Sequence, residues 1–290
     1  MTTERFNAIP SLPARTADSN KGDYGTVIVL GGGRGMAGAV ALARAGALRS
    51  GAGKVRIVCP FEVQPTVAQF EPSYMAYPIA DDGHGHFDFP LCGVVLEKMI
   101  AESTILVVGP GMGQTDKTRA LMRWILESVT IPTIIDADGL NNLEGQAKLL
   151  HNLKRPVIIT PHPKEFSRLT GETVEAIQGD REGHACRLAS HDHLVVVLKG
   201  SGTVVTDGTR VYLNKTGNPG MATGGSGDVL GGVIAAMMGQ SLNAFEAAVL
   251  GVYAHGLAGD IAKDQNGEVG MIAGDIVDSL ADAFVHLGPG

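Results

Sequence analysis

The segment from residue 217 to 232 combines glycines, a serine and an acid in a pattern suited to handling a phosphoryl group. Seven of its sixteen residues are glycine, and the apolar residues 229–238 predict a helix. Gly225, Ser226 and Gly227 would then expose backbone N–H groups at the helix N-terminus, where the helix dipole favours anions. Asp228, in the first turn, could take a proton from a substrate hydroxyl. The alternative is a glycine-rich turn capped by Ser226 or Asp228, although a cap alone does not require so many glycines.

A second glycine-rich segment follows the first apolar run of the chain. Gly33-x-Gly35-x-x-Gly38 is formally a dinucleotide fingerprint, but a lone match of this kind is weak. A Rossmann domain also needs an acid at the end of its second strand, and the corresponding run ends Ile57-Val58-Cys59-Pro60. The chain contains no GxxxxGK[ST] sequence. The residues therefore disfavour a hydride-transfer Rossmann domain and exclude a Walker A loop.

Short β-branched runs alternate with helical patterns, and together they indicate the fold that must position these residues. Continuous apolar runs, typical of parallel strands buried on both faces, lie at 26–30, 55–59, 105–108, 133–136, 157–160 and 194–198. Helices are expected at 37–50, 117–128, 164–169 and 173–189, and after Gly225 almost to the end. Runs at 203–206 and 210–213 flank Asp207-Gly208, a hairpin signal. The alternation predicts an α/β sandwich whose ligands bind beyond the carboxyl ends of its strands.

Composition places the chain among folded proteins. Its 290 residues are 44% hydrophobic and 18% charged, which excludes intrinsic disorder. The net charge of −7 argues against a nucleic-acid surface, and no apolar run is long enough to cross a membrane. The first 21 residues lack a signal-peptide pattern, and the three cysteines fit reduced thiols, so we expect a cytoplasmic location. We expect an arm over residues 1–20 and a single domain over 21–290.

Six segments stand in the order found in one branch of the ribokinase-like superfamily. TGGSGD at 223–228, followed by a small-residue helix, resembles the GxGD anion hole of ribokinase-like kinases. The other segments narrow the resemblance to the NAD(P)H-hydrate dehydratase family; they are GGGRGMAGA at 31–39 with GALRSGAG at 46–53, VGPGMG at 108–113, DADGLN at 136–141, TPHPKE at 160–165 and KGSGT at 199–203. The resemblance implies a ribokinase-like three-layer α/β/α sandwich with a mostly parallel central sheet.

The resemblance also implies a lyase reaction, the removal of water from hydrated NADH or NADPH (NADHX or NADPHX) driven by a nucleotide. The hydrate's hydroxyl is phosphorylated and phosphate then leaves, because hydroxide is a poor leaving group at neutral pH. Asp228 would be the base on that hydroxyl and a substrate contact. Gly225 and Gly227 would stabilise charge building on the phosphoryl oxygens. ADP rather than ATP follows from the likeness to stand-alone bacterial members.

The family's nucleotide-binding segment corresponds to residues 199–203. Lys199 would bring a cation, and the residues after it backbone donors, to the nucleotide phosphates. The implied nucleotide contacts are Lys199, Gly200, Ser201, Gly202, Thr203 and Gly227. An ordinary turn between strands with an exposed lysine accounts for residues 199–203 equally well.

His162 and Glu165 lie in a turn that two prolines stiffen. Their spacing parallels the Asn-x-x-Glu of the wider kinase superfamily, where the glutamate helps to organise Mg²⁺ through water. Mg²⁺ is therefore an expected cofactor, with Glu165 as its water-mediated ligand. Histidine in place of asparagine agrees with the dehydratase branch, where it contacts the hydrate. A turn-capping histidine and an acid in the first helical turn are the alternatives.

Four further residues are candidates for the pocket. Ala39 and Gly113 match substrate-binding positions of the family, although both could simply belong to tight strand-to-helix turns. Asp136 and Asp138, two residues apart, could face a shared metal or water. Asp138 could instead cap the next helix.

Two rival functions remain beside the dehydratase. The nearest is a small-molecule kinase on the same fold, acting on a vitamin precursor such as a hydroxyethylthiazole. GGGRGMAGA and TPHPKE match the dehydratases better. The other is a nucleotide-binding sensor without turnover, against which the intact Asp228 and Lys199 argue. The expected partners are NADHX or NADPHX, ADP or ATP, and copies of this chain, since members of the family are often tetramers.

Overall fold

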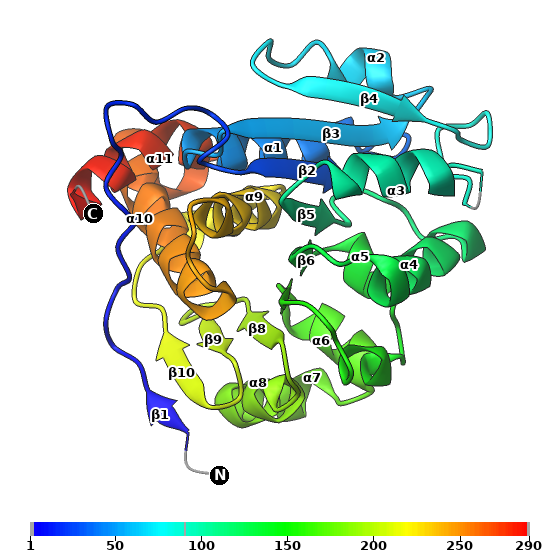
Figure 1. Ribbon diagram of the computed structural model, residues 1–290. Coiled ribbons are helices and arrows are strands. Elements are labelled where there is room, and N and C mark those ends of the chain that lie inside the picture. The colour runs from blue at the N-terminus through cyan, green and yellow to red at the C-terminus, as the bar shows by residue number, and fades with distance from the viewer. Residues whose placement is uncertain (1–2, 90, 289–290) are drawn as a thin grey trace.

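A computed structural model describes residues 3–89 and 91–288. Within these residues the centre of the molecule is a ten-stranded sheet, in the order β1-β10-β9-β8-β7-β6-β5-β2-β3-β4 (Figure 1). The strands are β1 Glu4–Arg5, β2 Thr26–Leu30, β3 Lys54–Pro60, β4 Met75–Ile79, β5 Ile105–Val108, β6 Thr133–Ile135, β7 Val157–Ile159, β8 Leu194–Leu198, β9 Val204–Thr206 and β10 Arg210–Leu213. In the order of the sheet, the seven neighbouring strands β8, β7, β6, β5, β2, β3 and β4 are parallel, and β9 is antiparallel to β8. The predicted mostly parallel sheet is confirmed.

Helices cover both faces of the sheet, which makes three layers (Figure 1). One face packs against α3 Gly93–Ala101, α4 Asp116–Ser128, α5 Asp138–Asn141, α6 Pro163–Thr170, α7 Val174–Gly179 and α8 Arg181–Ala189. The other packs against α1 Ala37–Arg49, α2 Gln64–Val67, α9 Ser226–Gly239 and α10 Ala244–Gly270, with α11 Ala273–Leu287 outside them. Two short 3₁₀ turns, Ala147–Leu150 and Pro219–Met221, complete the described elements.

The strand residues alternate between the two cores. In β2, Ile28 and Leu30 face the core under α3–α8, whereas Val27 and Val29 face the core under α1, α9 and α10. All five β2 residues are buried. Because both faces are covered, no polar residue is needed in alternate positions, which explains the continuous apolar runs of the sequence.

The helices α1 and α9 pack with their backbones in close contact. A Cβ atom on Gly46 of α1 would collide with the Val229 carbonyl, and one on Gly232 of α9 would collide with the Ala43 carbonyl. The two glycines therefore let the helices approach, which fixes the N-terminus of α9 above the sheet.

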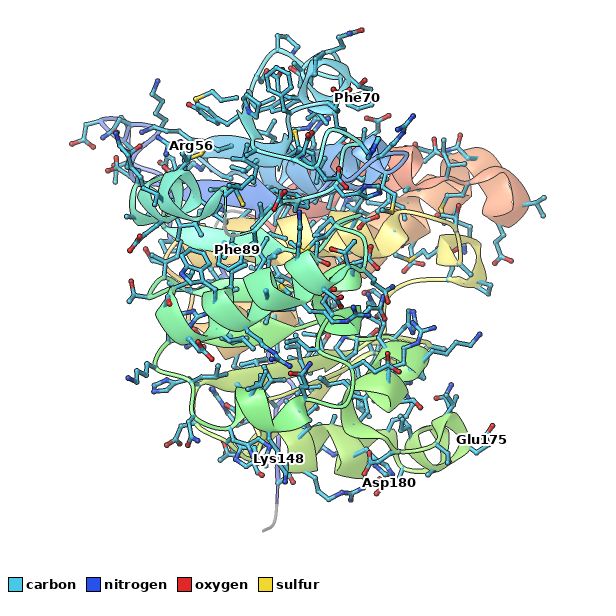
Figure 2. All side chains as sticks on the ribbon, turned by 90° about the vertical axis from the view of Figure 1, so that its right-hand side faces the viewer. Arg56, Phe70, Phe89, Lys148, Glu175 and Asp180 are labelled. Carbon is cyan, nitrogen blue, oxygen red and sulfur yellow. The ribbon has the colours of Figure 1, made fainter. Side chains whose placement is uncertain are left out.

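The predicted elements differ from the structure at a helix boundary, at both edges of the sheet and in two helices. The expected helix at 173–189 is two helices, α7 and α8, because Asp180 interrupts it and caps α8 by accepting a hydrogen bond from the Gly183 amide. Asp180 lies at the surface (Figure 2). The sequence did not predict β1, β4, α2 or α3. β4 is one of the two edge strands and is only partly buried, so it lacks the apolar run that marked its neighbours.

The N-terminal segment is attached to the domain at separate points. β1 pairs with β10, the Phe6 ring packs edge-on against Phe245 at 5.2 Å, and Arg15 donates to the Gly51 carbonyl. The division into an arm over 1–20 and a domain over 21–290 stays a prediction. Among the described residues, no helix has both the length and the apolar character needed to cross a bilayer.

Candidate active site

The polar residues singled out by the sequence converge at the carboxyl edge of the parallel strands. Asp136 follows β6, Thr160 follows β7 and Lys199 follows β8, and these three strands are neighbours in the sheet. Parallel neighbours end at the same edge, so residues far apart in the sequence meet there.

Asp136 and Lys199 form an ion pair at this edge. The Lys199 Nζ lies 2.8 Å from Asp136 Oδ1, which also accepts a hydrogen bond of 2.7 Å from the Thr160 hydroxyl. The Asp136 side chain is 1% exposed and that of Lys199 19%. Burial alone would lower the pKa of Lys199, but the carboxylates of Asp136 and Glu165 outweigh it and raise that pKa. Lys199 is therefore a charged residue held by partners, not a freely exposed turn lysine.

His162 and Glu165 start helix α6 as a reciprocal cap. The His162 Nδ1 accepts from the amides of Lys164 and Glu165, and Glu165 Oε2 accepts from the His162 amide at 2.8 Å. Lys199 Nζ lies 3.7 Å from the same Oε2. Burial raises the pKa of the Glu165 carboxyl and lowers that of the His162 ring. His162 and Glu165 therefore do cap α6, as the alternatives expected. Glu165 also lies next to the Asp136–Lys199 pair.

Asp228 stands in the first turn of α9 among other carboxylates. The pKa of Asp228 is raised to about 7, mainly because the carboxyl is buried. The negative charge of Asp136 raises this pKa further, whereas the positive charge of Lys199 lowers it. A carboxyl with this pKa is ionised in a substantial fraction at neutral pH and binds a proton more strongly than an exposed aspartate does. Such a group is suited to accept a proton from a hydroxyl.

The N-terminus of α9 offers unpaired backbone donors. In the part of the chain that the structure describes, the amides of Gly225, Gly227 and Asp228 donate to no protein acceptor, and no side chain caps the helix. Gly225 has φ +91°, and a Cβ there would collide with Leu42. The alternative of a turn capped by Ser226 or Asp228 is therefore wrong, and the start of the helix is left open to an anion.

His255 of α10 holds this helix start in place. Its Nε2 lies 2.9 Å from the Ser226 carbonyl oxygen, and burial lowers the pKa of the ring to about 4. The ring is therefore neutral at pH 7, and Nε2–H donates to the carbonyl, which can only accept. The sequence did not identify His255, because a single histidine inside a long apolar helix carries no motif.

A cavity of about 410 Å³ opens in front of Asp228, and we call it the Asp228 cavity. Asp138, Gly225 and Asp228 line it together with Ala39 from the start of α1. It brings together the predicted catalytic residues Gly225 and Asp228 and the predicted substrate contact Ala39. Gly113 is not among the lining residues, but its amide donates to Oδ2 of Asp138, which lines the cavity, at 2.9 Å.

The two aspartates of the DADGLN segment turn to different partners. Ala137, between them, has φ +48°, an uncommon value for a residue with a side chain. Asp136 faces Lys199, whereas Asp138 accepts from the amide of Gly113 and from Gln114. Their protein partners are thus different, and Asp138 is not the N-cap of α5.

The 199–203 segment turns back from β8 into β9 at the same edge. Gly200, Ser201 and Gly202 are exposed. Arg181 of α8 donates to the carbonyls of Leu198, Ser201 and Gly202 and so fixes the turn. Arg181 was missed by the sequence analysis, since its role depends on the packing of α8 against the end of β8.

The comparison with protein families decides between the related kinases and dehydratases. The family model described as NAD(P)H-hydrate dehydratase matches residues 27–282. The chain belongs to this family. The resemblance drawn from the six motifs is thereby confirmed.

Alignments with curated relatives cover nearly the whole chain. The bifunctional NAD(P)H-hydrate repair enzyme of Moorella thermoacetica is 42% identical over 271 residues, 93% of this chain and 51% of that protein. The chain thus spans about half the length of this relative. The ADP-dependent (S)-NAD(P)H-hydrate dehydratase of Neisseria meningitidis is 37% identical over 91% of this chain and 86% of that protein.

Solved structures of the family share the fold. The ADP/ATP-dependent NAD(P)H-hydrate dehydratase of Bacillus subtilis, co-crystallised with ATP and Mg²⁺, superimposes with a TM-score of 0.80 at 32% identity, over 95% of this chain and 94% of that one. A hydroxyethylthiazole kinase of Pyrococcus horikoshii has a TM-score of 0.57 at 16% identity over 85% of this chain and 94% of that one, a likeness of fold alone. The predicted ribokinase-like fold is confirmed.

Proposed function

We propose that this chain is an ADP-dependent (S)-NAD(P)H-hydrate dehydratase that repairs NADHX and NADPHX. The observation that carries the proposal is the position of Asp228, a carboxyl with a pKa of about 7, in the first turn of α9. At this helix start the amides of Gly225, Gly227 and Asp228 have no acceptor among the described residues. A proton acceptor and an anion site in contact are what transfer of a phosphoryl group to a hydroxyl requires.

The reaction proceeds in two steps. In the first, the hydrate's hydroxyl gives its proton to Asp228 and its oxygen bonds to the terminal phosphorus of ADP, so AMP leaves. In the second, the C–O bond of the phosphate ester breaks, phosphate leaves with the bonding electrons, and a proton is lost from the neighbouring ring carbon. The ring double bond is restored. Phosphate leaves more easily than hydroxide, which is why a nucleotide is consumed.

The remaining site residues divide between the two substrates. Gly225 and Gly227 stabilise the negative charge on the transferring group, through the amides at the helix start. The nucleotide contacts are Lys199, Gly200, Ser201, Gly202, Thr203 and Gly227. The hydrate contacts are Ala39, Gly113, His162 and Asp228. This division is supported by geometry, since Ala39 and Asp228 line one cavity and Gly227 lies next to Lys199.

Mg²⁺ belongs to the proposal as the partner of the nucleotide phosphates. Across the described ranges 3–89 and 91–288, no group of three or more His, Cys, Asp or Glu side chains could hold a metal ion. Mg²⁺ commonly uses one or two carboxylates together with phosphates and water, so the site fits it. Both Glu165 oxygens have partners, at 2.8 Å from the His162 amide and 3.4 Å from the His162 ring, which favours contact through water. The ion would neutralise phosphate charge.

We further propose a cytoplasmic location and a homotetramer. The location follows from the three cysteines, which fit reduced thiols, and the tetramer rests on the resemblance to the family.

The test is direct. The protein is incubated with NADHX or NADPHX, Mg²⁺ and either ADP or ATP, and the absorbance band of the reduced nicotinamide is followed. We expect the band to return with a nucleotide and Mg²⁺, and to stay absent when either is withheld or EDTA is in excess. No recovery with either nucleotide would refute the function, and full activity in EDTA would refute the role of the metal.

A further inference from the structure

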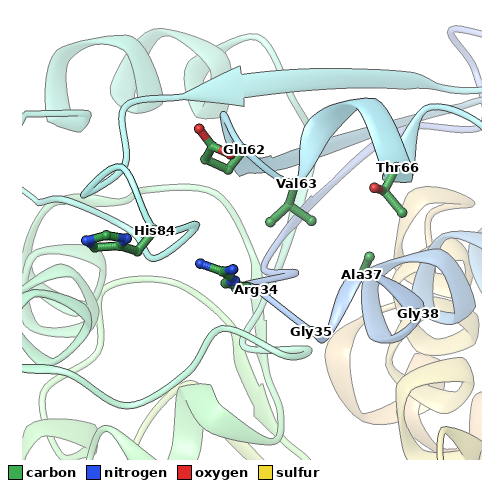
Figure 3. A pocket seen from close by; sticks show the side chains of 8 residues that line it. All are labelled: Arg34, Gly35, Ala37, Gly38, Glu62, Val63, Thr66 and His84. Atoms are coloured by element: carbon green, nitrogen blue, oxygen red, sulfur yellow. The ribbon is translucent and has the colours of Figure 1, made fainter.

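A second cavity, of about 440 Å³, adjoins the Asp228 cavity; we call it the outer cavity (Figure 3). Its polar lining comes from Arg34, Glu62 and His84, among other residues. It shares Gly35 and Gly38 with the Asp228 cavity, so the two are separated only by a glycine strip.

The outer cavity lies at the same edge of the sheet as the catalytic residues. Arg34 follows β2, Glu62 follows β3 and His84 follows β4, three adjacent parallel strands. A ligand seated beside Asp228 can therefore continue along the carboxyl edge of the sheet without crossing a layer.

The lining loops are held by their own hydrogen bonds. The Arg34 amide donates to the Gly85 carbonyl at 2.9 Å, and the Glu62 amide donates to Asp81 Oδ2 at 2.9 Å. The His84 amide donates to Asp82 Oδ1, also at 2.9 Å. The shape of the cavity is thus set before any ligand arrives, which lowers the entropic cost of binding.

Arg34 is an exposed cation that has no partner among the residues the structure describes. Within the described residues, its guanidinium has no carboxylate within 4.0 Å and makes no hydrogen bond. Glu62, on the same cavity, is also exposed and makes no ion pair in the described part of the chain. Guanidinium groups bind phosphate with two parallel hydrogen bonds, and carboxylates accept from ribose hydroxyls.

Packing does not account for the glycines of this strip, because a Cβ built on Gly35 or Gly38 meets no atom within 4 Å. The φ of Gly35, +79°, itself favours glycine, whereas Gly38 has no such backbone requirement. Gly38 lies in the first turn of α1, where glycine is less favourable than alanine by about 0.5–1 kcal/mol. An absent side chain leaves room for something that passes over the helix start.

We propose that the outer cavity binds the non-reacting part of the hydrated dinucleotide, with Arg34 on one of its phosphates and Glu62 on a ribose. This inference rests on the proposed function. The Asp228 cavity must hold the hydrated ring and the phosphoryl group that reacts with it. The rest of the dinucleotide extends across Gly35 and Gly38, because that strip leads to an adjoining cavity with a free cation.

The first experiment removes the cation. Arg34→Gln raises the KM of the hydrated dinucleotide about tenfold, the loss of one charge-assisted hydrogen bond, and leaves the KM of ADP unchanged. A rise for both NADHX and NADPHX assigns Arg34 to the pyrophosphate, and a rise for NADPHX alone assigns it to the 2′-phosphate. Arg49→Gln, an exposed arginine at the other end of α1, is the matched control and changes neither KM.

The second experiment fills the glycine strip. Gly38→Leu keeps or improves the stability of α1, since leucine is a good helix former and its Cβ meets no neighbour. It raises the KM of both dinucleotides and not that of ADP, with the melting temperature as the control for folding. Unchanged dinucleotide KM values in both variants would overturn the proposal.

A binding measurement separates this inference from the proposed function. Titration calorimetry with NADP⁺ gives the Kd for wild type and Arg34→Gln without any turnover. Suppose that the variant binds NADP⁺ tenfold more weakly and that the wild type does not repair NADPHX. The proposed function would then be refuted, and the dinucleotide site would stand. If the wild type is active but Arg34→Gln changes neither the Kd nor the KM, the proposed function stands and the dinucleotide site is refuted.

Discussion

The Nζ of Lys199 lies 2.8 Å from Oδ1 of Asp136, and this contact joins the ends of β8 and β6 across β7. The pair compensates the cost of burying each charge. It also places a cation beside three carboxylates, since Glu165 and Asp228 lie nearby. The charge balance of this group of carboxylates therefore depends largely on Lys199.

Removing this lysine should destabilise the fold. We expect Lys199→Met to lower the free energy of unfolding by about 3 kcal/mol, because Asp136 is left buried and unpaired. The double variant Lys199→Met, Asp136→Asn should recover at least half of that loss in urea unfolding. A double variant as unstable as the sum of the two single variants would show that the two side chains are not coupled.

Asp228→Asn should nearly abolish turnover, by at least about a hundredfold in kcat, because asparagine cannot accept the hydroxyl proton. Nucleotide binding should change little, since the amides at the start of α9 remain. Stopped-flow or steady-state absorbance gives kcat, and calorimetry with ADP gives the Kd. Wild-type rates in this variant would remove Asp228 from the chemistry.

The pH dependence of activity should follow Asp228. Since the base must be ionised and its pKa is raised to about 7, kcat/KM should fall about tenfold for each pH unit below 7. The profile of nucleotide binding alone should not show this step. A flat rate between pH 5.5 and 8 would contradict the assignment.

The stability of the fold should also depend on the protonation of Asp228, but it should fall as the pH rises, whereas activity should rise. A raised pKa means that the folded state binds the proton more tightly than the unfolded chain, so this stabilisation is complete below about pH 4 and is lost as pH rises through 7. Asp228→Asn does not lose this stabilisation, because asparagine does not titrate. The melting temperature of the variant should therefore rise relative to that of the wild type between pH 5 and pH 8. Parallel curves of melting temperature against pH would contradict the prediction.

His162 should have two separable roles. His162→Ala removes the acceptor for the amides of Lys164 and Glu165 and should cost about 1 kcal/mol, whereas His162→Asn can keep that cap. Both variants lose the ring and should raise the KM of the hydrate more than that of ADP. A larger effect on ADP would place His162 with the nucleotide instead.

Much of the fold could be predicted because its signals are local. A strand buried on both faces is apolar at every position, so β2 and β8 were visible as short runs such as residues 194–198. The edge strand β4 was not predicted, because its residues are mostly half-buried or exposed and its apolar pattern is broken. The break between α7 and α8 at Asp180 was not predicted either, because a capping aspartate and a solvent-facing one look alike in a sequence.

The candidate site divides in the same way. The sequence by itself determined the glycine-rich start of α9, the acid that follows it and the order of the six motifs, since each is a short run of residue types. Tertiary structure alone decided that Lys199 meets Asp136, 63 residues away, and that His255 holds the Ser226 carbonyl. The raised pKa of Asp228 and the open cavity beside Arg34 were also decided there. Burial and charge pairing depend on which strand ends lie side by side, and that neighbourhood exists only once the sheet has formed.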